Sequence, residues 1–229
     1  MTDQLQPERL QPMPWCLDQP PPLAPPAPSH PLVLLLESQQ PLEPACRASL
    51  QASLAPAERQ RLAGLRRPAD QHRFLLARGG LRRLLAACVG GPAAAVPLEA
   101  GRHGKPHCPG GPAFNLSHAG DLILIALHPQ QPVGVDVERQ RPGLSWPPIA
   151  RRVLPAAEWQ ALEQLPAAAQ PAACLAAWCR LEARLKANGE GFAGLERLRR
   201  DPSACSATAL WDVVVPEGYA AAVALAPSP

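Results

Sequence analysis

Lysine is scarce in this chain of 229 residues, because only Lys105 and Lys186 among its 22 basic residues are lysines. An ammonium is a compact charge on a flexible stem, whereas a guanidinium is a planar fork, so the two bind partners differently. Since the chain otherwise uses arginine, we expect these two positions to require an ammonium. Eight arginines fall between residues 57 and 83, which favours either a phosphate-binding or acidic-partner surface or a solvated helix face.

Long apolar runs, a secretory leader and paired-cysteine motifs are absent as well. No apolar run approaches the length of a membrane span and the N-terminus is polar, so we expect a cytoplasmic protein without a membrane partner. The seven cysteines show no CxxC spacing and are predicted to be reduced. His103, His107 and Cys108 leave a zinc site open as an alternative, although proline and glycine interrupt them. A net charge of +3 does not indicate a nucleic-acid partner.

Proline is abundant, with 31 residues, and its distribution suggests how the chain is divided. Residues 1–30 form a proline-rich arm that we expect to be extended or poorly ordered, with Trp15 as its contact to the body. We expect the remainder to consist of an N-terminal half at 31–112 and a C-terminal half at 113–229 that carries a metal site.

Apolar periodicity predicts an α+β protein. Two similar halves are expected, each a small, mainly antiparallel sheet packed with helices, with the active site at their junction. Helices are predicted at 50–65, 68–89, 147–154, 155–165 and 167–187, the last broken near Pro171. Strands are predicted at 31–37, 96–98, 113–117, 122–127, 133–138, 210–215 and 219–225. The three strands over 113–138 are expected to form an antiparallel meander.

The strand Val133–Glu138, VGVDVE, places two carboxylates on one face. Side chains alternate along a strand, so Gly134, Asp136 and Glu138 point the same way. Adjacent carboxylates repel one another unless a cation lies between them, and Mg²⁺ prefers carboxylates, waters and phosphate oxygens. We therefore expect a solvent-facing metal site, with room for a ligand beside Gly134. The alternative is an exposed acidic edge.

The stretch Trp178–Gly191, WCRLEARLKANGEG, predicts a helix with Glu182 and Lys186 one turn apart on one face. Glu182 becomes a third carboxylate of the metal site if this helix packs across the strand. Taken alone, the pair is more typical of a solvated surface ion pair than of a site. His118 lies at a strand tip, where ligands commonly bind.

Three motifs in this order, FNLSHAG, GVDVE and WCRLEARLKANGEG, resemble those of the 4′-phosphopantetheinyl transferase superfamily. The similarity covers roughly residues 54–192 and is to the larger, monomeric group typified by the surfactin synthetase activating enzyme, in which one chain forms a pseudo-dimer. It implies Mg²⁺-dependent transfer of 4′-phosphopantetheine from coenzyme A to a serine of an apo acyl or peptidyl carrier protein. Adenosine 3′,5′-bisphosphate is then the leaving group.

The resemblance also implies roles for individual residues. Asp136, Glu138 and Glu182 would hold Mg²⁺ against the pyrophosphate of coenzyme A. Glu182 would also act as the base toward the serine, and Lys186 would stabilise charge on the bridging or leaving phosphate. His118 would be a third catalytic residue and would also contact the coenzyme, together with Lys105, Pro106 and Ser117. Arg61 and Arg73 would lie near the 3′-phosphate.

Two positions depart from the family pattern. Leu181 stands where the family usually has lysine, and Arg180 or Arg184 is a candidate substitute. Glu58 stands where relatives often place a basic residue, which shifts the 3′-phosphate role toward Arg61. Two alternatives remain open: a Mg²⁺-dependent hydrolase of coenzyme A or a nucleotide pyrophosphate, and a non-catalytic paralogue that binds carrier protein.

Overall fold

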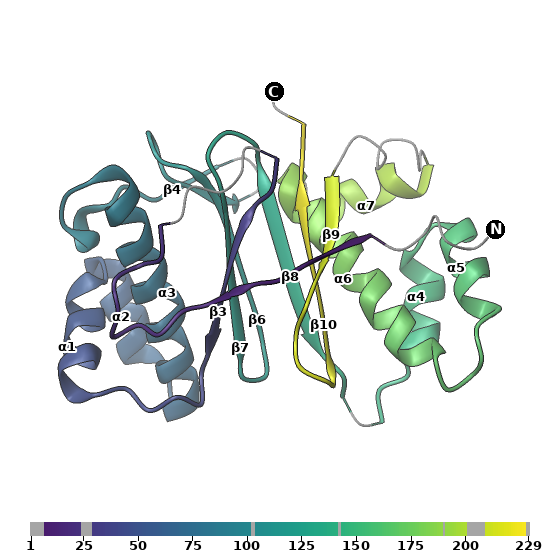
Figure 1. Cartoon of the computed structure of the whole chain (residues 1–229), viewed down its shortest axis with the longest axis horizontal. Coiled ribbons are helices and arrows are strands. Elements are labelled where there is room, and N and C mark those ends of the chain that lie inside the picture. Colours follow the sequence, from purple (N-terminus) through teal and green to yellow (C-terminus); the bar gives the residue numbers. More distant parts are fainter. Residues whose placement is uncertain are drawn as a thin grey trace.

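The computed structural model describes residues 7–23, 29–101, 104–141, 143–189, 191–200 and 209–227. The fold is α+β, as the sequence predicts, with two four-stranded sheets between two groups of helices (Figure 1). No helix in these ranges is both long enough and apolar enough to cross a membrane.

Each sheet consists of three antiparallel strands and one parallel edge strand from the arm. The N-terminal sheet has the order β2-β3-β7-β6, and the C-terminal sheet has the order β1-β9-β10-β8. Only the β2–β3 and β1–β9 pairs are parallel. The strands are β1 (Glu8–Leu10), β2 (Met13–Pro14), β3 (Leu32–Glu37), β6 (Ala113–Ala119), β7 (Leu122–His128), β8 (Val133–Arg139), β9 (Ala209–Val213) and β10 (Tyr219–Leu225).

The predicted meander over 113–138 is wrong in its third strand. β6 and β7 form an antiparallel hairpin, but β8 pairs with β10 in the other sheet. The edges of β6 and β8 are joined by side chains: Asn115 Oδ1 accepts from Val135 N at 2.9 Å and Ser117 Oγ from Val137 N at 3.4 Å. These bonds satisfy N–H groups of β8 without adding β8 to the N-terminal sheet. The two sheets therefore meet where β6 and β8 lie side by side, and this line of contact is called the seam below.

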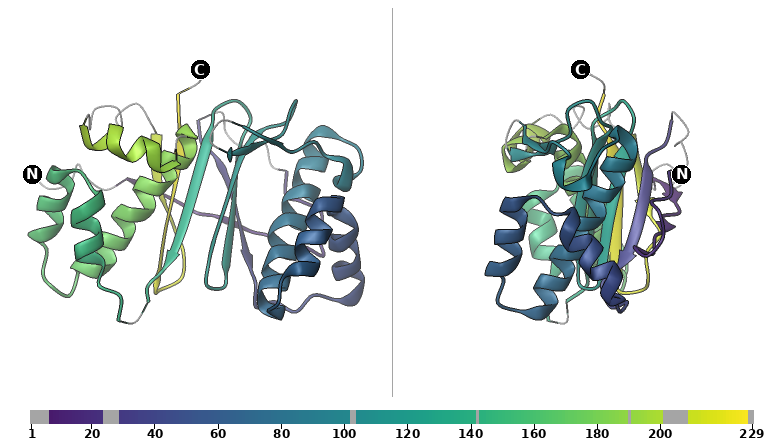
Figure 2. Two further views of the ribbon diagram at one scale, coloured as in Figure 1. Left: turned by 180° about the vertical axis from the view of Figure 1, so that it is seen from behind. Right: turned by 90° about the vertical axis from the view of Figure 1, so that its left-hand side faces the viewer.

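Helices cover the outer sides of both sheets (Figures 1 and 2). The helices of residues 44–89 lie against the N-terminal sheet, and those of residues 146–200 lie on the side of the C-terminal sheet. A shared apolar cluster between the two sheets includes Leu124, Val135 and Val223. The helices are α1 (Pro44–Ser53), α2 (Pro56–Gly64), α3 (Pro68–Val89), α4 (Trp146–Val153), α5 (Ala156–Glu163), α6 (Gln170–Asn188) and α7 (Gly191–Arg200). A short hairpin, β4 (Glu99–Ala100) and β5 (Pro106–His107), follows the 3₁₀ turn η1 (Ala93–Ala95).

The region predicted as one helix over 50–65 contains two helices, because Pro56 begins α2 and holds the preceding Ala55 in an extended conformation. The strand expected at 96–98 lies slightly later, as β4. Pro171 lies in the first turn of α6 and does not break it, since proline is tolerated there.

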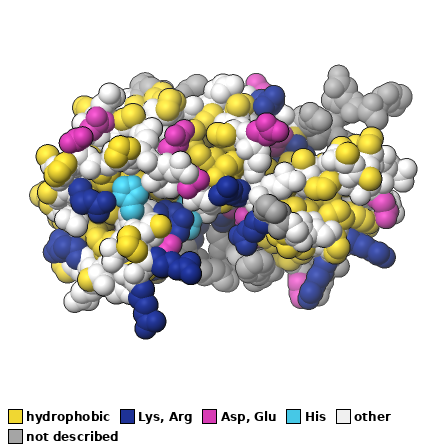
Figure 3. Space-filling model, turned by 90° about the horizontal axis from the view of Figure 1, so that it is seen from below, with side chains coloured by type: hydrophobic (Ala, Val, Ile, Leu, Met, Phe, Trp, Pro, Cys, Tyr) yellow, Lys and Arg dark blue, Asp and Glu magenta, His cyan; other side chains and the backbone are white. Residues whose placement is uncertain are grey.

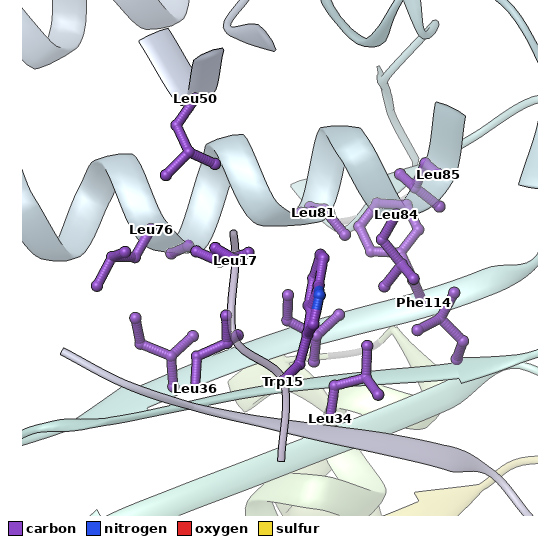
Figure 4. Close-up of a cluster of buried hydrophobic side chains, with 14 of the residues drawn as sticks. Trp15, Leu17, Leu34, Leu36, Leu50, Leu76, Leu81, Leu84, Leu85 and Phe114 are labelled. Atoms are coloured by element: carbon purple, nitrogen blue, oxygen red, sulfur yellow. The ribbon is translucent and has the colours of Figure 1, made fainter. Parts of the chain in front are cut away.

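Two glycines inside α3 allow close packing. A Cβ on Gly79 would lie 3.1 Å from Leu50, and one on Gly80 would lie 3.1 Å from Leu17. Figure 4 shows Leu17 and Trp15 between α3 and the sheet. This packing against α1 and the arm offsets the helix-propensity cost of glycine, about 1 kcal/mol each.

The arm is not poorly ordered over residues 7–23. It runs as extended chain across both sheets, contributing β1 to one and β2 to the other (Figure 1, purple). Trp15 is buried, as expected, and Arg83 Nη1 donates to the carbonyl of Leu17 at 2.5 Å. The buried apolar side chains compensate for the ordering of this proline-rich segment.

Candidate functional site at the junction of the two sheets

Asp136 lies on β8 at the seam between the sheets, and it is buried rather than solvent-facing, with 4% of its surface exposed. Its Oδ1 accepts hydrogen bonds from Lys186 Nζ at 2.5 Å and from Ser117 Oγ at 3.0 Å. Its Oδ2 is also buried and has no hydrogen-bond partner in the described part of the chain. A buried anionic oxygen without a partner is unfavourable, so this atom is suited to a cation.

α6 reaches this strand because Gly134 lets the two backbones touch. A Cβ on Gly134 would lie 2.1 Å from the Ala183 carbonyl oxygen and 2.3 Å from the Ala187 nitrogen. The space that the sequence suggested for a ligand is therefore filled by α6, and that hypothesis is wrong. The contact instead brings Lys186, and Glu182 one turn earlier, beside the carboxylates of β8.

The two glutamates of this cluster have raised pKa values. Burial raises the pKa of Glu138, and the charge of Asp136 raises it further. Burial likewise raises the pKa of Glu182, with Asp136 and Glu138 acting in the same direction and Lys186 opposing them. These shifts place all three carboxylates in one electrostatic cluster, in which Lys186 forms an ion pair with Asp136.

This donor set fits a hard divalent cation in its chemistry, because it offers carboxylate oxygens, one of them buried and unpaired. Within the described ranges, however, no three His, Cys, Asp or Glu side chains converge closely enough to ligate an ion as they stand. A metal ion would therefore draw Glu138 and Glu182 toward Asp136, and would compete with Lys186 for that carboxylate.

A pocket of about 620 Å³ opens between α2, α3, the β4–β5 hairpin and β6. It contains four of the residues predicted to bind coenzyme: Arg61, Arg73, Pro106 and His118. Its other lining residues are Ala57, Glu58, Leu65, Asp70, Phe74, Ala77, Arg78, Leu98, Glu99, Ala100, Gly104 and Leu116. Figure 3 shows basic side chains, with acidic ones among them, across one face of the molecule.

The arginines of the pocket are held by neighbours. Arg61 lies over the Phe74 ring, 5.6 Å from its centroid. Arg73 pairs with Asp70 at 2.5 Å and donates to the Gly120 carbonyl at 3.2 Å. Both retain donors in this orientation, because a guanidinium has five N–H groups.

His118 connects the pocket with the carboxylate cluster. Burial lowers its pKa, as do the charges of Arg73 and, more weakly, Lys186. Its imidazole lines the pocket and is close enough to Arg73 and Lys186 for both charges to act on it. Its neighbour Ser117 bonds to Asp136 instead of lining the pocket, because successive side chains of a strand point to opposite faces.

Glu58 is not a free acidic group in the pocket. It accepts from Arg78 at 2.5 Å, from Arg82 and from Ala55 N at 3.0 Å. Burial acts to raise its pKa, but the backbone hydrogen bond and the charge of Arg78 lower it overall. Glu58 thus neutralises Arg78 and leaves Arg61 and Arg73 as the pocket's anion-binding candidates.

Lys105 is placed differently from the prediction. Its neighbours Gly104 and Pro106 line the pocket, but its ammonium donates to three main-chain carbonyls at the end of α6 and the start of β8. The sequence pattern did not show that the side chain leaves the pocket.

Leu181 completes the apolar stripe of α6, with 1% of its surface exposed. Neither candidate substitute for the missing lysine reaches the cluster. Arg180 forms a two-bond ion pair with Asp212, and Arg184 pairs with Glu158 at 3.4 Å.

Asn115 is a residue of the site that the sequence reasoning assigned no role. Its side chain holds the β8 backbone one residue before Asp136. The alternation of Asn115 and Ser117 with the apolar Phe114 and Leu116 along β6 was the available signal. The zinc alternative gains no support, because Cys108 is buried in the core, His107 is exposed, and His103 lies outside the described residues.

Comparison with known proteins gives the family of the chain. Residues 132–213 match the family model of the 4′-phosphopantetheinyl transferase superfamily. The chain is 30% identical over 172 residues to the 4′-phosphopantetheinyl transferase HetI of Nostoc, covering 69% of this chain and 73% of that protein. It is 32% identical over 169 residues to a putative 4′-phosphopantetheinyl transferase of Synechocystis, slr0495, covering 72% and 67% of the two chains.

A shorter match covers 41% of this chain and 34% of a phosphopantetheinyl transferase of Thraustochytrium, at 38% identity. The family match begins at β8 and spans the carboxylates of the strand together with the whole of α6. On this combined evidence, the chain belongs to the 4′-phosphopantetheinyl transferase superfamily.

Proposed function

We propose that this protein transfers the 4′-phosphopantetheine group of coenzyme A to a serine hydroxyl of an apo acyl or peptidyl carrier protein. The observation that carries the proposal is that His118 lines a basic pocket and is also close enough to the carboxylate cluster for the charge of Lys186 to lower its pKa. An anionic nucleotide in the pocket would extend its pyrophosphate past His118 toward Asp136.

Mg²⁺ is the proposed metal, and Asp136, Glu138 and Glu182 are its proposed ligands. The ion would neutralise the pyrophosphate and make the three carboxylates compatible with an anionic substrate. Arg61 and Arg73 would receive the 3′-phosphate end of the nucleotide, where paired N–H groups suit phosphate oxygens. His118 would lie against the pyrophosphate, with Pro106 covering the nucleotide.

In the proposed reaction, the serine oxygen forms a bond to the phosphorus that carries pantetheine. The bond from that phosphorus to the bridging oxygen breaks, and adenosine 3′,5′-bisphosphate leaves. Glu182 would accept the serine proton, a task for which its raised pKa makes it a stronger base. Lys186 would stabilise negative charge on the departing oxygen, having a flexible stem that can turn from Asp136.

We also infer that the two halves are similar and that the boundary lies at 129–132, not at 112–113. In each sheet a first strand is followed by helices and then by two further strands, and the spatial order is first, third, second: β3-β7-β6 and β8-β10-β9. This repeat supports the larger, pseudo-dimeric subtype.

Because one chain supplies both sides of the seam, we propose a monomer. The cytoplasm is the proposed location, since the six cysteines in the described ranges are free thiols.

The test is to incubate the protein with apo carrier protein, coenzyme A and Mg²⁺ and to weigh the carrier by mass spectrometry. A carrier that gains the mass of phosphopantetheine, with release of adenosine 3′,5′-bisphosphate, is the expected result. No gain on any of several acyl and peptidyl carriers would contradict the proposal. Loss of coenzyme A without carrier modification would instead identify a hydrolase. Binding of carrier without either change would identify a non-catalytic paralogue, which the burial of Leu181 in the helix stripe gives no reason to expect.

Mg²⁺ is expected to raise the melting temperature at neutral pH and to do so less in acid. The raised pKa values of Glu138 and Glu182 mean that the folded state binds protons more tightly than the unfolded state. Their ionisation therefore destabilises the metal-free fold as the pH rises through these pKa values, and bound Mg²⁺ offsets that effect. At 100 times its dissociation constant the ion adds about 2.7 kcal/mol. As the pH falls, protons compete for the same oxygens and the gain shrinks.

Calorimetry of the protein with and without MgCl₂, at about pH 7 and about pH 5, measures this difference. Glu182→Gln is expected to reduce the Mg²⁺-dependent rise. An equal rise in both proteins, or a larger rise in acid, would contradict the assignment of these carboxylates to the metal.

A further inference from the structure

Lys105 lies in the loop of the β4–β5 hairpin, directly before β5 and between two residues that line the nucleotide pocket. Gly104 precedes it and Pro106 follows it, and both contribute to the pocket wall. The Lys105 carbonyl accepts from Gly101 N at 2.8 Å, which closes the hairpin loop. Any movement of this wall must therefore move the backbone of Lys105.

The Lys105 side chain points away from the pocket and its hydrogen bonds are all used. Nζ donates to the carbonyls of Lys186 at 2.6 Å, Val133 at 3.0 Å and Ala187 at 3.1 Å. An ammonium has three N–H donors, and here three acceptors take them. No donor remains for a phosphate oxygen, so this geometry does not suit the phosphate contact that the family resemblance implied.

The three acceptors belong to the two elements that carry the carboxylate cluster. Lys186 and Ala187 are in the last turn of α6, where the helix dipole favours a positive charge, and the Lys186 carbonyl also accepts from Gly189 N at 3.2 Å. Val133 is the first residue of β8, three residues before Asp136. One ammonium thus fixes the hairpin, the helix and the strand relative to one another.

Lys186 is held at both ends in this arrangement. Its carbonyl accepts from Lys105 at 2.6 Å, while its own ammonium donates to Asp136 at 2.5 Å. Lys105 is therefore linked through one backbone carbonyl to the residue that forms the ion pair with Asp136.

We propose that Lys105 is a positioning residue that couples occupancy of the nucleotide pocket to the placement of α6 against β8, and that it does not bind substrate phosphate. This inference rests on the proposed function of the site. A bound nucleotide presses on Gly104 and Pro106, and Lys105 converts that contact into the alignment of Glu182 and Lys186 with Asp136.

The geometry also explains why lysine stands here in a chain that otherwise uses arginine. Three carbonyls from two elements converge on one nitrogen, which a tetrahedral ammonium satisfies and a planar fork does not. Burial lowers the pKa of Lys105 to about 8, so the group is still mostly protonated at neutral pH.

The test compares Lys105→Met with Arg61→Met in the carrier-modification assay and by calorimetry with coenzyme A and Mg²⁺. For Lys105→Met we expect kcat to fall about 100-fold, because small misplacements of catalytic groups have effects of this size. KM for coenzyme A should change by no more than about threefold, which corresponds to under 1 kcal/mol. Arg61→Met, which alters a pocket residue, should show the opposite pattern, a raised KM with kcat largely kept.

Calorimetry supplies a readout that does not depend on turnover. In the wild type, Mg²⁺ and coenzyme A should strengthen each other's binding, and Lys105→Met should abolish this coupling while coenzyme A still binds. Lys105→Arg should restore it only in part. Lys105→Gln, which keeps an N–H donor toward the carbonyls, is the second variant if the methionine protein is not folded by circular dichroism.

A raised KM for coenzyme A with unchanged kcat, rescued by arginine, would show that Lys105 is a phosphate ligand and would overturn the inference. Equal kcat, KM and coupling in Lys105→Met and wild type would overturn it as well. If the wild type modifies no carrier, the proposed function fails, and the coupling measurement still decides the role of Lys105. If the wild type binds no coenzyme A, both proposals fail.

Discussion

Asp136→Asn is expected to lower carrier modification by about 10²- to 10³-fold, the range measured when one charge-stabilising group is removed from an active site. The substitution keeps the shape of the side chain and an acceptor for Ser117, but it removes the charge that Lys186 and the proposed metal share. The protein should stay folded, because the neutral amide also relieves repulsion with Glu138 and Glu182. Single-turnover mass spectrometry of the carrier at saturating coenzyme A and Mg²⁺ measures the effect.

Asp212→Asn is the matched control. Asp212 also faces α6 and also pairs with a basic residue of that helix, Arg180, at 2.6 Å, but it lies outside the carboxylate cluster. It is partly exposed, so losing this ion pair should cost at most about 1 kcal/mol. Activity in this variant should stay within about twofold of wild type, since the site is untouched. If Asp136→Asn retained comparable turnover, Asp136 would have no role in metal binding.

The local pattern predicts most elements of the fold because each carries a strong periodic signal. α3 matches the helix predicted at 68–89, and β10 matches the strand predicted at 219–225. The partner of β8 was not predictable in this way. Apolar alternation specifies that 133–138 is a strand, but the turn after β7 allows either a hairpin or a crossing to a second sheet. The deciding bonds come from Asn115 and Ser117, which satisfy β8 through side chains.

The candidate site shows the same division between local and long-range information. The strand period puts Asp136 and Glu138 on one face, and the helix period puts Glu182 beside Lys186. These pairings can therefore be predicted from the sequence. The distance between elements that are far apart in the chain cannot be predicted in this way. Lys105 is 81 residues before the carbonyl that it binds most closely, and no local pattern links the two. Leu181 is explained only by packing, as a buried member of the helix stripe.

Gly134→Ala is expected to separate α6 from β8 and to reduce both stability and activity. The added Cβ would lie 2.1 Å from the Ala183 carbonyl oxygen and 2.3 Å from the Ala187 nitrogen. Both are backbone atoms, so neither can rotate away as a side chain would, and the helix must shift by about 1 Å to restore normal contact distances. Overpacking of this kind costs about 1–3 kcal/mol, and a rigid backbone contact places Gly134 at the upper end of that range.

The activity loss should exceed what unfolding explains, because the helix that shifts carries Glu182 and Lys186. A displacement of about 1 Å at catalytic groups costs about 10²-fold in rate even in protein that stays folded. Circular dichroism gives the folded fraction, and turnover per folded molecule is the quantity to compare. Gly64→Ala is the control, since no atom lies within 4 Å of its Cβ and its backbone is unstrained. That variant should keep both its melting temperature and its turnover. Normal turnover per folded molecule in Gly134→Ala would mean that the contact between α6 and β8 supports the fold alone, and that alignment of the helix with Asp136 does not limit the reaction.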